Sequence, residues 1–428
     1  MMDWLLFGLF AVLMLSGVPL AVAMGLAGTA VVAASGLGMM SLPTNVYTGI
    51  AKYPLMAIPV FVIAGLIFER AGVAATIVRF ASAVVGQRQG SLAIVAIIVA
   101  MILGGISGSG PADSAAVGAV MLPSMLKAGY PRQFTAAVIA AAGSTDILIP
   151  PSIAFVIYSL LVPQASVPAL FAAGMIPGIL SGLTLILVAW WLSVRHGFES
   201  QPAAPRPPFW QSLKDAGWGL AAPVIILGGM RSGLFTPTEA AVVAVFYGFL
   251  VGKVIYRSLS WRDIYNVLVE SAEISSVILT VVALASVFAW ASNTLGTFDH
   301  LANAMLGTGL PEIAMLISIQ VLLLIAGMFL DAISIYFIFL PLLVPIAIHF
   351  NWDLVWFGVV ITMNMALGQF HPPLGVNLMV TCRMAGVSME STIPWALWML
   401  AAMAGTMFLV TFVPELALWL PRTLGYLD

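Results

Sequence analysis

Long apolar stretches, separated by short polar or glycine-rich segments, dominate the pattern of this chain. Five of them approach or exceed the roughly 20 residues that a helix needs to cross a hydrocarbon core; they lie at residues 4–34, 91–106, 169–194, 237–255 and 313–330. They are rich in Leu, Ile, Val and Ala and lack the alternating polarity of barrel strands, so they predict membrane-spanning helices. No basic residue precedes the first stretch, which favours a retained helix over a cleaved signal peptide.

Charged positions mark three segments that differ from the spans. Residues 195–217 are hydrophilic and proline-rich, which predicts an exposed linker, and their Arg and Lys side chains place it in the cytoplasm. Residues 68–88 and 260–276 keep a helical period but carry charge, so they are either arms along the membrane interface or ordinary loop helices. Glu239 follows Thr236 and Pro237 in the pattern of a capping box, so we interpret it as structural.

Glycine and proline interrupt the apolar pattern at four places. The run GGISGSGP at residues 104–111 cannot continue a helix, because its four glycines are costly and its proline lacks a donor. The flanking apolar segments are short for spans, so we predict a re-entrant hairpin whose tip lies inside the membrane, buried in protein or beside water. Further breaks are predicted at residues 144–151, 327–331 and 368–373.

These breaks fall into two matched pairs. Asp113 precedes Pro123 by ten residues, and Asp331 precedes Pro341 by ten. A Pro-Pro pair then begins 27 residues after Pro123 and 31 residues after Pro341. The repetition favours a duplicated unit over chance recurrence. Paired segments of this kind point to the binding site of a secondary transporter.

Composition places the chain in a membrane. Of its 428 residues, 62% are hydrophobic and 7% are charged, against roughly 25% charged in a soluble domain. We therefore expect an all-α polytopic membrane protein. The single cysteine, Cys382, excludes an internal disulfide or thiolate cluster. No GxxxxGK[ST] loop occurs, which argues against a primary pump, and we expect no nucleic-acid partner.

Each break combines free backbone carbonyls with Ser, Thr, Asn or Asp, the hard oxygen ligands that an alkali cation needs, while helix starts favour an anion. Structural alternatives remain for several polar residues. Asp113 could be the third residue of its helix and Asp331 an N-cap. Asp146 could bind a cation or cap a turn, and His371 could be a turn residue or a proton relay. Arg383 could meet a carboxylate or extend to the interface.

At these breaks the sequence resembles a known family. The segments GxSGSGPADSAA and TDxLIPPS, the later PPLGVN and the twelve-helix scale of the hydropathy are similar to the large membrane (M) subunit of tripartite ATP-independent periplasmic (TRAP) transporters. The resemblance covers nearly the whole chain. A weaker resemblance links the chain to the ion-transporter superfamily of sodium-coupled dicarboxylate carriers. Those carriers have Ser-Asn-Thr at their hairpin tips, whereas this chain has SGSGPAD.

The resemblance implies an inverted-repeat, elevator-type transporter with two re-entrant hairpins and two Pro-Pro-broken helices. It implies symport driven by sodium, with two or more Na⁺ ions, in the bacterial inner membrane. Two partners follow: a small four-helix membrane subunit, expected as a separate chain, and a periplasmic substrate-binding protein. The cargo would be an organic acid such as sialic acid or a C4-dicarboxylate.

We expect the ions and the acid at the breaks. The predicted first sodium site comprises Ser107, Ser109, Gly110, Asp113, Ser144, Thr145 and the Pro150 carbonyl, and the second comprises Gly327, Asp331, Gly368, Pro372, Gly375 and Asn377. The substrate carboxylate is expected between the two tips, near Ser109, Ser334 and Asn377, with Arg383 as a possible additional partner.

The chain is expected to divide into N-terminal scaffold helices at 1–60, a first transport repeat at 61–168, scaffold helices at 169–285, a second transport repeat at 286–390 and a C-terminal helix at 391–428. Residues 61–159 and 286–383 should move as one body that carries both ion sites, while residues 169–255 stay fixed. Glycines at 86–90 and 307–309 would form the joints.

Other functions remain open at this point. A stand-alone sodium/dicarboxylate symporter or sodium/proton antiporter would need no binding protein. An intramembrane enzyme would need a catalytic constellation, but the four histidines, at positions 196, 300, 349 and 371, are scattered and no HExxH occurs. We therefore expect no enzymatic activity, and a channel is disfavoured because occluding hairpins are a device of carriers.

Overall fold

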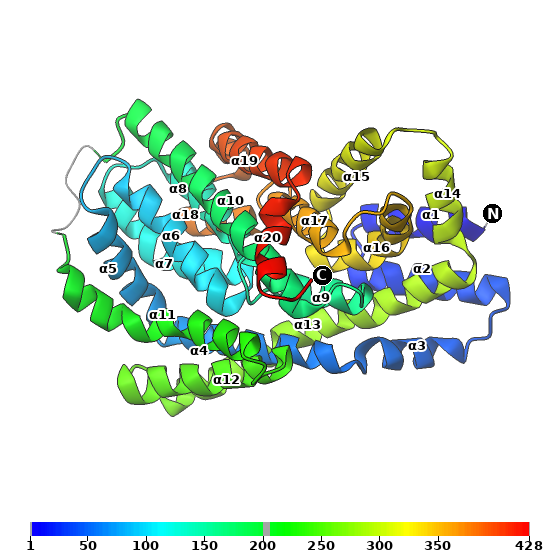
Figure 1. Cartoon of the computed structure of the whole chain (residues 1–428), viewed down its shortest axis with the longest axis horizontal. Helices are drawn as coiled ribbons and strands as arrows, with labels where there is room; N and C mark the ends of the chain where they lie inside the picture. Colours follow the sequence, from blue (N-terminus) through cyan, green and yellow to red (C-terminus); the bar gives the residue numbers. More distant parts are fainter. Residues whose placement is uncertain (1, 200–205, 428) are drawn as a thin grey trace.

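Helices make up all the regular structure in this computed structural model, which describes residues 2–199 and 206–427 (Figure 1). Six helices in the described chain are long and apolar enough to cross a membrane, and six shorter apolar helices accompany them. The predicted all-α architecture is therefore confirmed.

Glycine and proline set the boundaries of the first repeat. Helix α6 (Ser91–Ser107) and helix α7 (Gly110–Lys127) are joined by two residues and pack together as a helical hairpin. Helix α8 (Arg132–Gly143) then passes into a single 3₁₀ turn, η2 (Ser144–Ile147), and a non-helical segment precedes α9 (Ile153–Leu161). The break is predicted correctly, because two successive prolines remove backbone donors.

The second repeat has the same order of elements. Helices α15 (Glu312–Gly327) and α16 (Ala332–His349) form its hairpin, and α17 (Leu354–Gly368) and α18 (Val376–Ala385) are the halves of its broken helix. Each short half-helix packs on the other repeat: α18 on α7 and α8, and α9 on α16 and α17. The two repeats therefore interlock at their breaks.

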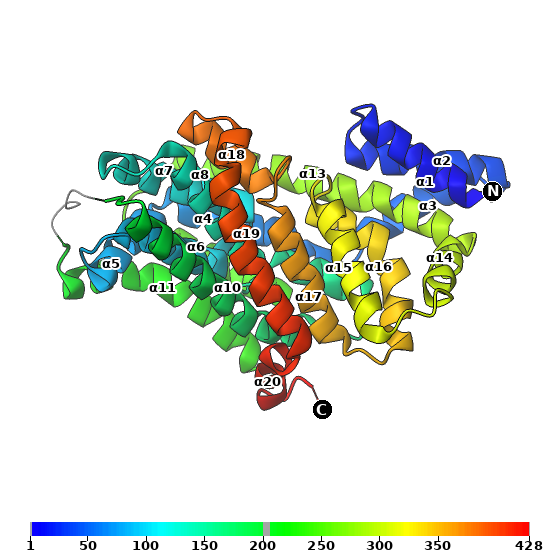
Figure 2. The same cartoon turned by 90° about the horizontal axis from the view of Figure 1, so that it is seen from above.

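Twelve further helices surround the repeats (Figures 1 and 2). They are α1 (Met2–Leu15), α2 (Leu20–Ser35), α3 (Ser41–Ile50), α4 (Ala57–Arg70), α5 (Val73–Val85), α10 (Val167–Arg195), α11 (Phe209–Arg231), α12 (Pro237–Phe249), α13 (Trp261–Thr294), α14 (Thr297–Leu306), α19 (Met389–Phe412) and α20 (Glu415–Thr423). A π-helical segment, Leu250–Ile255, extends α12. Helix α13 contacts α2, α3, α4 and α16, so it joins the N-terminal helices to the second repeat.

Several predicted boundaries are wrong. The stretch at 4–34 is two helices, α1 and α2, that pack on each other, because residues 16–19 contain Gly17 and Pro19. The linker predicted at 195–217 is shorter, since α11 begins at Phe209; within it, residues 200–205 lie outside the described residues.

The two charged segments also differ from expectation. Residues 260–276 are not a separate helix but the first half of the unbroken α13, and 68–88 comprises the end of α4 and all of α5. The domain boundary predicted at 285/286 therefore falls inside α13, and those at 60/61 and 390/391 fall inside α4 and α19. The capping box at Thr236 and Glu239 is confirmed.

Candidate functional site

The tip of the first hairpin lies directly against the first Pro-Pro break. Gly108 has φ +63°, and a Cβ built on it would lie 2.3 Å from the Pro151 carbonyl oxygen. Only glycine meets both conditions, the left-handed backbone and the close approach. The tip and the break are thus held together as one unit.

Asp113 faces back toward this tip. Helix α7 begins at Gly110, so Asp113 is its fourth residue and not its third, and it caps nothing. Instead its carboxylate accepts a hydrogen bond from the Ser107 hydroxyl, which itself accepts one from the Ser109 backbone N–H at 3.2 Å. The carboxylate is buried, so this pair brings a compact set of oxygen atoms together at the tip.

Asp146 completes that set from the broken helix. The residue is fully buried, and no donor in the described chain reaches either of its carboxylate oxygens, which excludes the capping alternative. Its carboxyl group interacts with that of Asp113. A Cβ on Gly104 would lie 2.6 Å from Asp146 Oδ1, so glycine leaves the room for this packing. Two acidic groups therefore share one buried pocket, an arrangement that costs several kcal/mol unless a cation or proton is bound.

The other residues predicted as ligands of the first site lie nearby, but the hydroxyl groups among them already donate hydrogen bonds to backbone carbonyls. The hydroxyls of Ser144 and Thr145 donate to the carbonyls of Ala141 and Ala142 at 2.7 Å and 2.8 Å, so only their oxygen lone pairs are available as ligands. The Pro150 carbonyl oxygen lies 3.6 Å from the position a Cβ would take on Gly105.

The start of α7 meets the second repeat. A Cβ on Gly110 would lie 2.3 Å from Gln369 Oε1 and 3.0 Å from Asn377 Nδ2. Asn377 donates to Gln369 Oε1 at 3.2 Å and to the Ala140 carbonyl at 3.3 Å, while its buried Oδ1 has no partner in the described chain. Asn377, predicted as a ligand of the second site, thus lies beside Gly110 of the first. Sequence reasoning missed Gln369, whose only signal was a polar residue beside the Pro-Pro break.

The second tip repeats the geometry of the first. Asp331 is the N-cap of α16, because its Oδ2 accepts from the Ile333 backbone N–H at 3.3 Å, and its Oδ1 accepts from the Ser334 hydroxyl. Gly327 and Gly368 are in contact, since a Cβ on Gly327 would lie 3.3 Å from Gly368 Cα. A Ser–Asp pair and a glycine contact therefore occur at both breaks.

Two further residues of the second break hold its turn. Gly375 packs so closely on residues 369–371 that a Cβ there would lie 2.7 Å from Phe370 Cα. His371 Nδ1 lies 2.5 Å from the Pro372 carbonyl oxygen, which fits the turn alternative for the histidine and engages a carbonyl predicted as an ion ligand.

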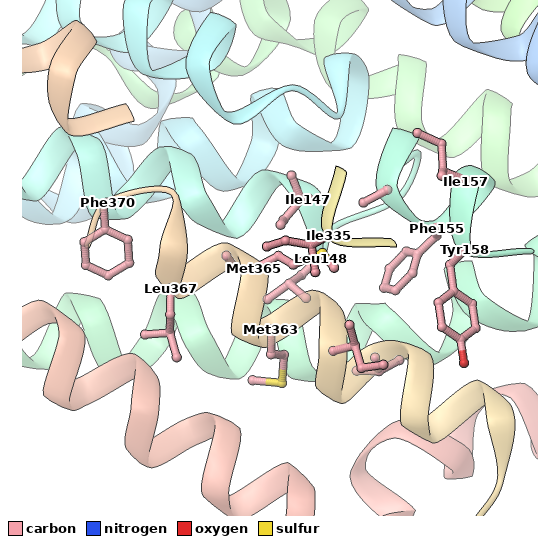
Figure 3. Packing of buried hydrophobic residues seen from close by; sticks show 14 of the residues in the cluster. Ile147, Leu148, Phe155, Ile157, Tyr158, Ile335, Met363, Met365, Leu367 and Phe370 are labelled. Carbon is pink, nitrogen blue, oxygen red and sulfur yellow. The ribbon is translucent and has the colours of Figure 1, made fainter. Parts of the chain in front are cut away.

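The two tips enclose a cavity of about 390 Å³. The first tip contributes residues 108–111, the second contributes residues 327–333 and Ile335, and Gln369 lies between them. Leu20 of α2 and Ile278 of α13 form the opposite wall. Ile147, Ile335 and Met365 also line the cavity, and Figure 3 shows them with Leu148 among the buried apolar side chains.

Three predicted substrate contacts do not line the cavity: Asn377, which is buried beside Gly110, Ser334 and Arg383. Ser334 is fully buried and its hydroxyl is bound to Asp331, so Ile333 and Ile335 line the cavity in its place. Arg383 is exposed in the last turn of α18 and does not line the cavity, which favours its interface alternative. The only charged side chain among the described lining residues is that of Asp331. Backbone N–H groups and bound cations would have to balance the negative charge of an anion in this cavity.

The chain matches a known family over most of its length. The family model described as "Tripartite ATP-independent periplasmic transporter, DctM component" covers residues 7–416. The C4-dicarboxylate TRAP transporter large permease protein DctM of Rhodobacter capsulatus is 36% identical in an alignment that covers 98% of this chain and 99% of that protein.

Two further proteins extend the comparison. The isethionate TRAP transporter permease protein DctMQ of Oleidesulfovibrio alaskensis is 37% identical over 97% of this chain, but the chain spans only 65% of that longer relative. The crystal structure of the YdaH transporter of Alcanivorax borkumensis matches with a TM-score of 0.63 over 88% of both chains at 15% identity, a likeness of fold alone. With hairpins, breaks and family match in agreement, the chain belongs to the DctM components, the large membrane subunits of tripartite ATP-independent periplasmic transporters.

Proposed function

We propose that this chain imports an organic acid across the bacterial inner membrane by sodium-coupled symport, using an elevator motion. The observation that carries the proposal is the pair of buried acidic groups, Asp113 and Asp146, beside a cavity without a cationic side chain among its described lining residues. A carboxylate substrate would be repelled from such a place unless cations bind with it.

Sodium ions would supply this charge. The first ion is assigned to the oxygens of Ser107, Asp113 and Asp146, the last of which accepts no hydrogen bond in the described chain. The second is assigned to the carbonyls around the Gly327–Gly368 contact together with Asp331. Carboxylate, hydroxyl and carbonyl oxygens are the hard ligands that alkali cations prefer. Bound Na⁺ would neutralise the tips and so create the anion site.

The acid would lie in the cavity between the tips. The first turns of α7, α16 and α18 begin at or beside its wall, and their free N–H groups favour an anion. Relatives carry names that specify a C4-dicarboxylate, isethionate and sialic acid. Each of these is an anion, so an organic acid is the substrate class proposed here.

Two partners belong to the proposal. A small membrane subunit is proposed as a separate polypeptide, in keeping with the name "large permease protein" of relatives that this chain covers almost completely. A periplasmic binding protein would deliver the acid from the outer side, in keeping with the tripartite family.

The test is uptake into liposomes that contain this chain and its small subunit, with the binding protein outside. Radiolabelled sialic acid and succinate are offered with an inward sodium gradient, or with choline in place of sodium. We expect uptake of one acid that requires both sodium and the binding protein. Uptake that persists in choline would contradict sodium coupling, and sodium-driven uptake by this chain alone would favour the stand-alone carrier.

A further inference from the structure

A second, larger cavity of about 550 Å³ lies between the N-terminal helices and the second repeat. Residues of α3, α9, α13, α14 and α16 line it, together with Lys52 just after α3. Unlike the candidate site, it is lined by many polar side chains: Asn45, Thr48, Lys52, Ser286, Trp290, Asn293 and Asp299. No residue predicted from the sequence as a ligand belongs to it.

Chain topology places this cavity on the outer side of the membrane. The basic linker that follows α10 lies in the cytoplasm by the positive-inside rule. Helix α10 is long enough to span and begins at Val167, so Val167 lies on the opposite side. Leu161, six residues before Val167, lines the cavity. The cavity therefore faces the side from which a binding protein delivers its cargo.

The same two helices, α13 and α16, line both cavities. At the candidate site they contribute Ile278 and Ile333, and at the outer cavity they contribute Trp290 and Pro341. Pro341 follows Ile333 by eight residues, which is about 12 Å along an α-helix. The outer cavity therefore lies about 12 Å from the candidate site along α16, on the side where α16 packs on α13.

Two charged side chains of opposite sign line the outer cavity. Lys52 and Asp299 are exposed, and neither forms an ion pair or a side-chain hydrogen bond with any residue that the structure describes. Asn293 likewise offers both of its amide N–H groups. Lys52 and Asn293 suit a carboxylate, whereas Asp299 accepts from hydroxyl groups and repels a second negative charge.

We propose that the outer cavity is a second binding station for an acid with one carboxylate and several hydroxyl groups. The acid is held there after release from the binding protein and before it reaches the tips. This inference rests on the proposed function, which it deepens in two respects: it adds a station outside the candidate site, and it favours a hydroxylated monocarboxylate over a dicarboxylate as the substrate class.

The experiment measures protection of a single cysteine. The chain with Cys382→Ala is reconstituted with its small subunit, and Thr48→Cys reports on the outer cavity, Ser109→Cys on the candidate site and Thr308→Cys on an exposed loop outside both. Labelling by a membrane-impermeant maleimide is timed in sodium with gluconate, which has one carboxylate, or with succinate, which has two. Gluconate should slow labelling of Thr48→Cys about three-fold or more, as an occupied site excludes reagent, and leave Thr308→Cys unchanged.

Charge variants make the result specific. Lys52→Gln should abolish the protection by gluconate, while the matched variant Lys127→Gln, at the exposed end of α7, should not. Asp299→Asn should allow succinate to protect Thr48→Cys. Equal protection by both acids in the unmodified cavity would overturn the assigned substrate class. Protection of Ser109→Cys without protection of Thr48→Cys would overturn the station and leave the proposed function standing; protection at neither position would also overturn the station, while the proposed function is tested by the uptake measurement, in which the binding protein delivers the acid.

Discussion

The carboxylate of Asp146 is fully buried, and neither of its oxygens has a hydrogen-bond partner in the described chain. If Na⁺ binds between Asp113 and Asp146, then Asp146→Asn removes half of the negative charge that holds the ion. We expect sodium-driven uptake to fall about ten-fold, a loss of roughly 1.4 kcal/mol of ion binding. The half-saturating sodium concentration should rise, as measured by uptake against sodium concentration in liposomes.

Stability separates this effect from misfolding. Because the asparagine removes a buried charge without changing shape, thermal unfolding of the purified variant should occur at the same temperature or higher. Asp263→Asn is the control, since Asp263 is only partly buried and belongs to the capping box that starts α13, away from the candidate site. It should leave sodium dependence unchanged. An unaltered sodium requirement in Asp146→Asn would remove Asp146 from the ion site.

Gly108 offers a second prediction at the scale of one residue. Gly108→Ala places a methyl group against the Pro151 carbonyl and forces alanine into left-handed backbone. Gly36→Ala is matched, because Gly36 has φ +68° and open space around its Cβ position. The backbone alone costs about 1–2 kcal/mol in each variant. Gly108→Ala should lose more thermal stability than Gly36→Ala and also lose uptake; equal losses would mean that the tip does not need its contact with the Pro-Pro break.

Sequence reasoning located the broken segments because Gly, Pro and polar residues interrupt apolar runs wherever a membrane helix breaks. It could not say which side chains turn toward the cavity. Ser334 and Arg383 had suitable chemistry, but Ser334 is bound to Asp331 and Arg383 lies at the surface. Asp146 remained undecided because its role depends on Asp113, 33 residues away in sequence, sharing the same pocket. Long-range packing of this kind leaves no local pattern.

At the scale of elements, α10 packs more closely on the first repeat than its predicted place in the scaffold suggests. A Cβ on Gly174 would lie 2.4 Å from the Phe155 ring and 2.5 Å from the Leu148 carbonyl oxygen. A Cβ on Gly182 would lie 2.2 Å from Met101 Sδ. We propose, from this packing and from the hydrogen bonds described next, that α10 moves with α6 and the broken helix.

The residues after α10 support the same inference. Glu199 accepts hydrogen bonds from the Ser91 hydroxyl at 2.6 Å and from the Tyr130 hydroxyl at 2.8 Å, which ties the segment after α10 to the start of α6 and to the loop that follows α7. Burial, reinforced by the Glu199 carboxylate, raises the pKa of Tyr130, so its hydroxyl stays protonated and remains a donor. On the other side of the linker, Arg206 Nε donates to the Ala83 carbonyl of α5 at 2.9 Å.

Gly174→Ala tests the close packing of α10. The added methyl group should destabilise the protein by about 1–3 kcal/mol, the usual effect of overpacking. The matched variant Gly228→Ala lies in α11 with open space at its Cβ position, where alanine should be neutral or stabilise the helix by about 0.5–1 kcal/mol. Thermal unfolding of the purified variants decides the matter. A Gly174→Ala protein as stable as Gly228→Ala would show that α10 is free to shift.

The order of elements was predictable, but the way they group was not. Hydropathy and Gly/Pro breaks predicted both hairpins, both broken helices and the helical scaffold. The charges at 260–276 suggested a separate interfacial helix, yet a capping box at Ser260 starts one helix that runs to Thr294. Charged residues indicate whether a segment lies in a polar or an apolar environment. The caps and backbone hydrogen bonds of a helix determine where it begins and ends.

At the scale of the whole molecule, the contacts suggest two bodies that differ from the predicted division. Helices α4 and α5 pack on α11, α12 and α13, and the ion pair of Arg70 with Glu270 at 2.6 Å joins α4 to α13. Helices α10 and α19 pack on the repeats. We therefore propose a fixed body of α1–α5 and α11–α13, and a moving body of α6–α10 and α15–α20. Two connections between these bodies contain the predicted glycine joints, at residues 86–90 and 307–309.

Disulfide cross-links distinguish motion within a body from motion between bodies. Thr184 of α10 and Thr406 of α19 have hydroxyl oxygens 2.9 Å apart, so Thr184→Cys with Thr406→Cys links two parts of the moving body. A Cβ on Gly105 of α6 would lie 3.6 Å from Pro223 Cβ of α11, so Gly105→Cys with Pro223→Cys links the moving body to the fixed one. The separation of the second pair lies in the Cβ–Cβ range of a disulfide, and the direct contact of the two threonine hydroxyl groups brings the first pair within reach of one. In a Cys382→Ala background, oxidation should leave uptake intact for the first pair. It should abolish uptake for the second pair until a reductant restores it, because the tip could no longer travel past α11. Normal uptake by the oxidised Gly105→Cys, Pro223→Cys variant would show that the tips bind and release the substrate without moving against α11. The elevator motion would then be wrong for this protein.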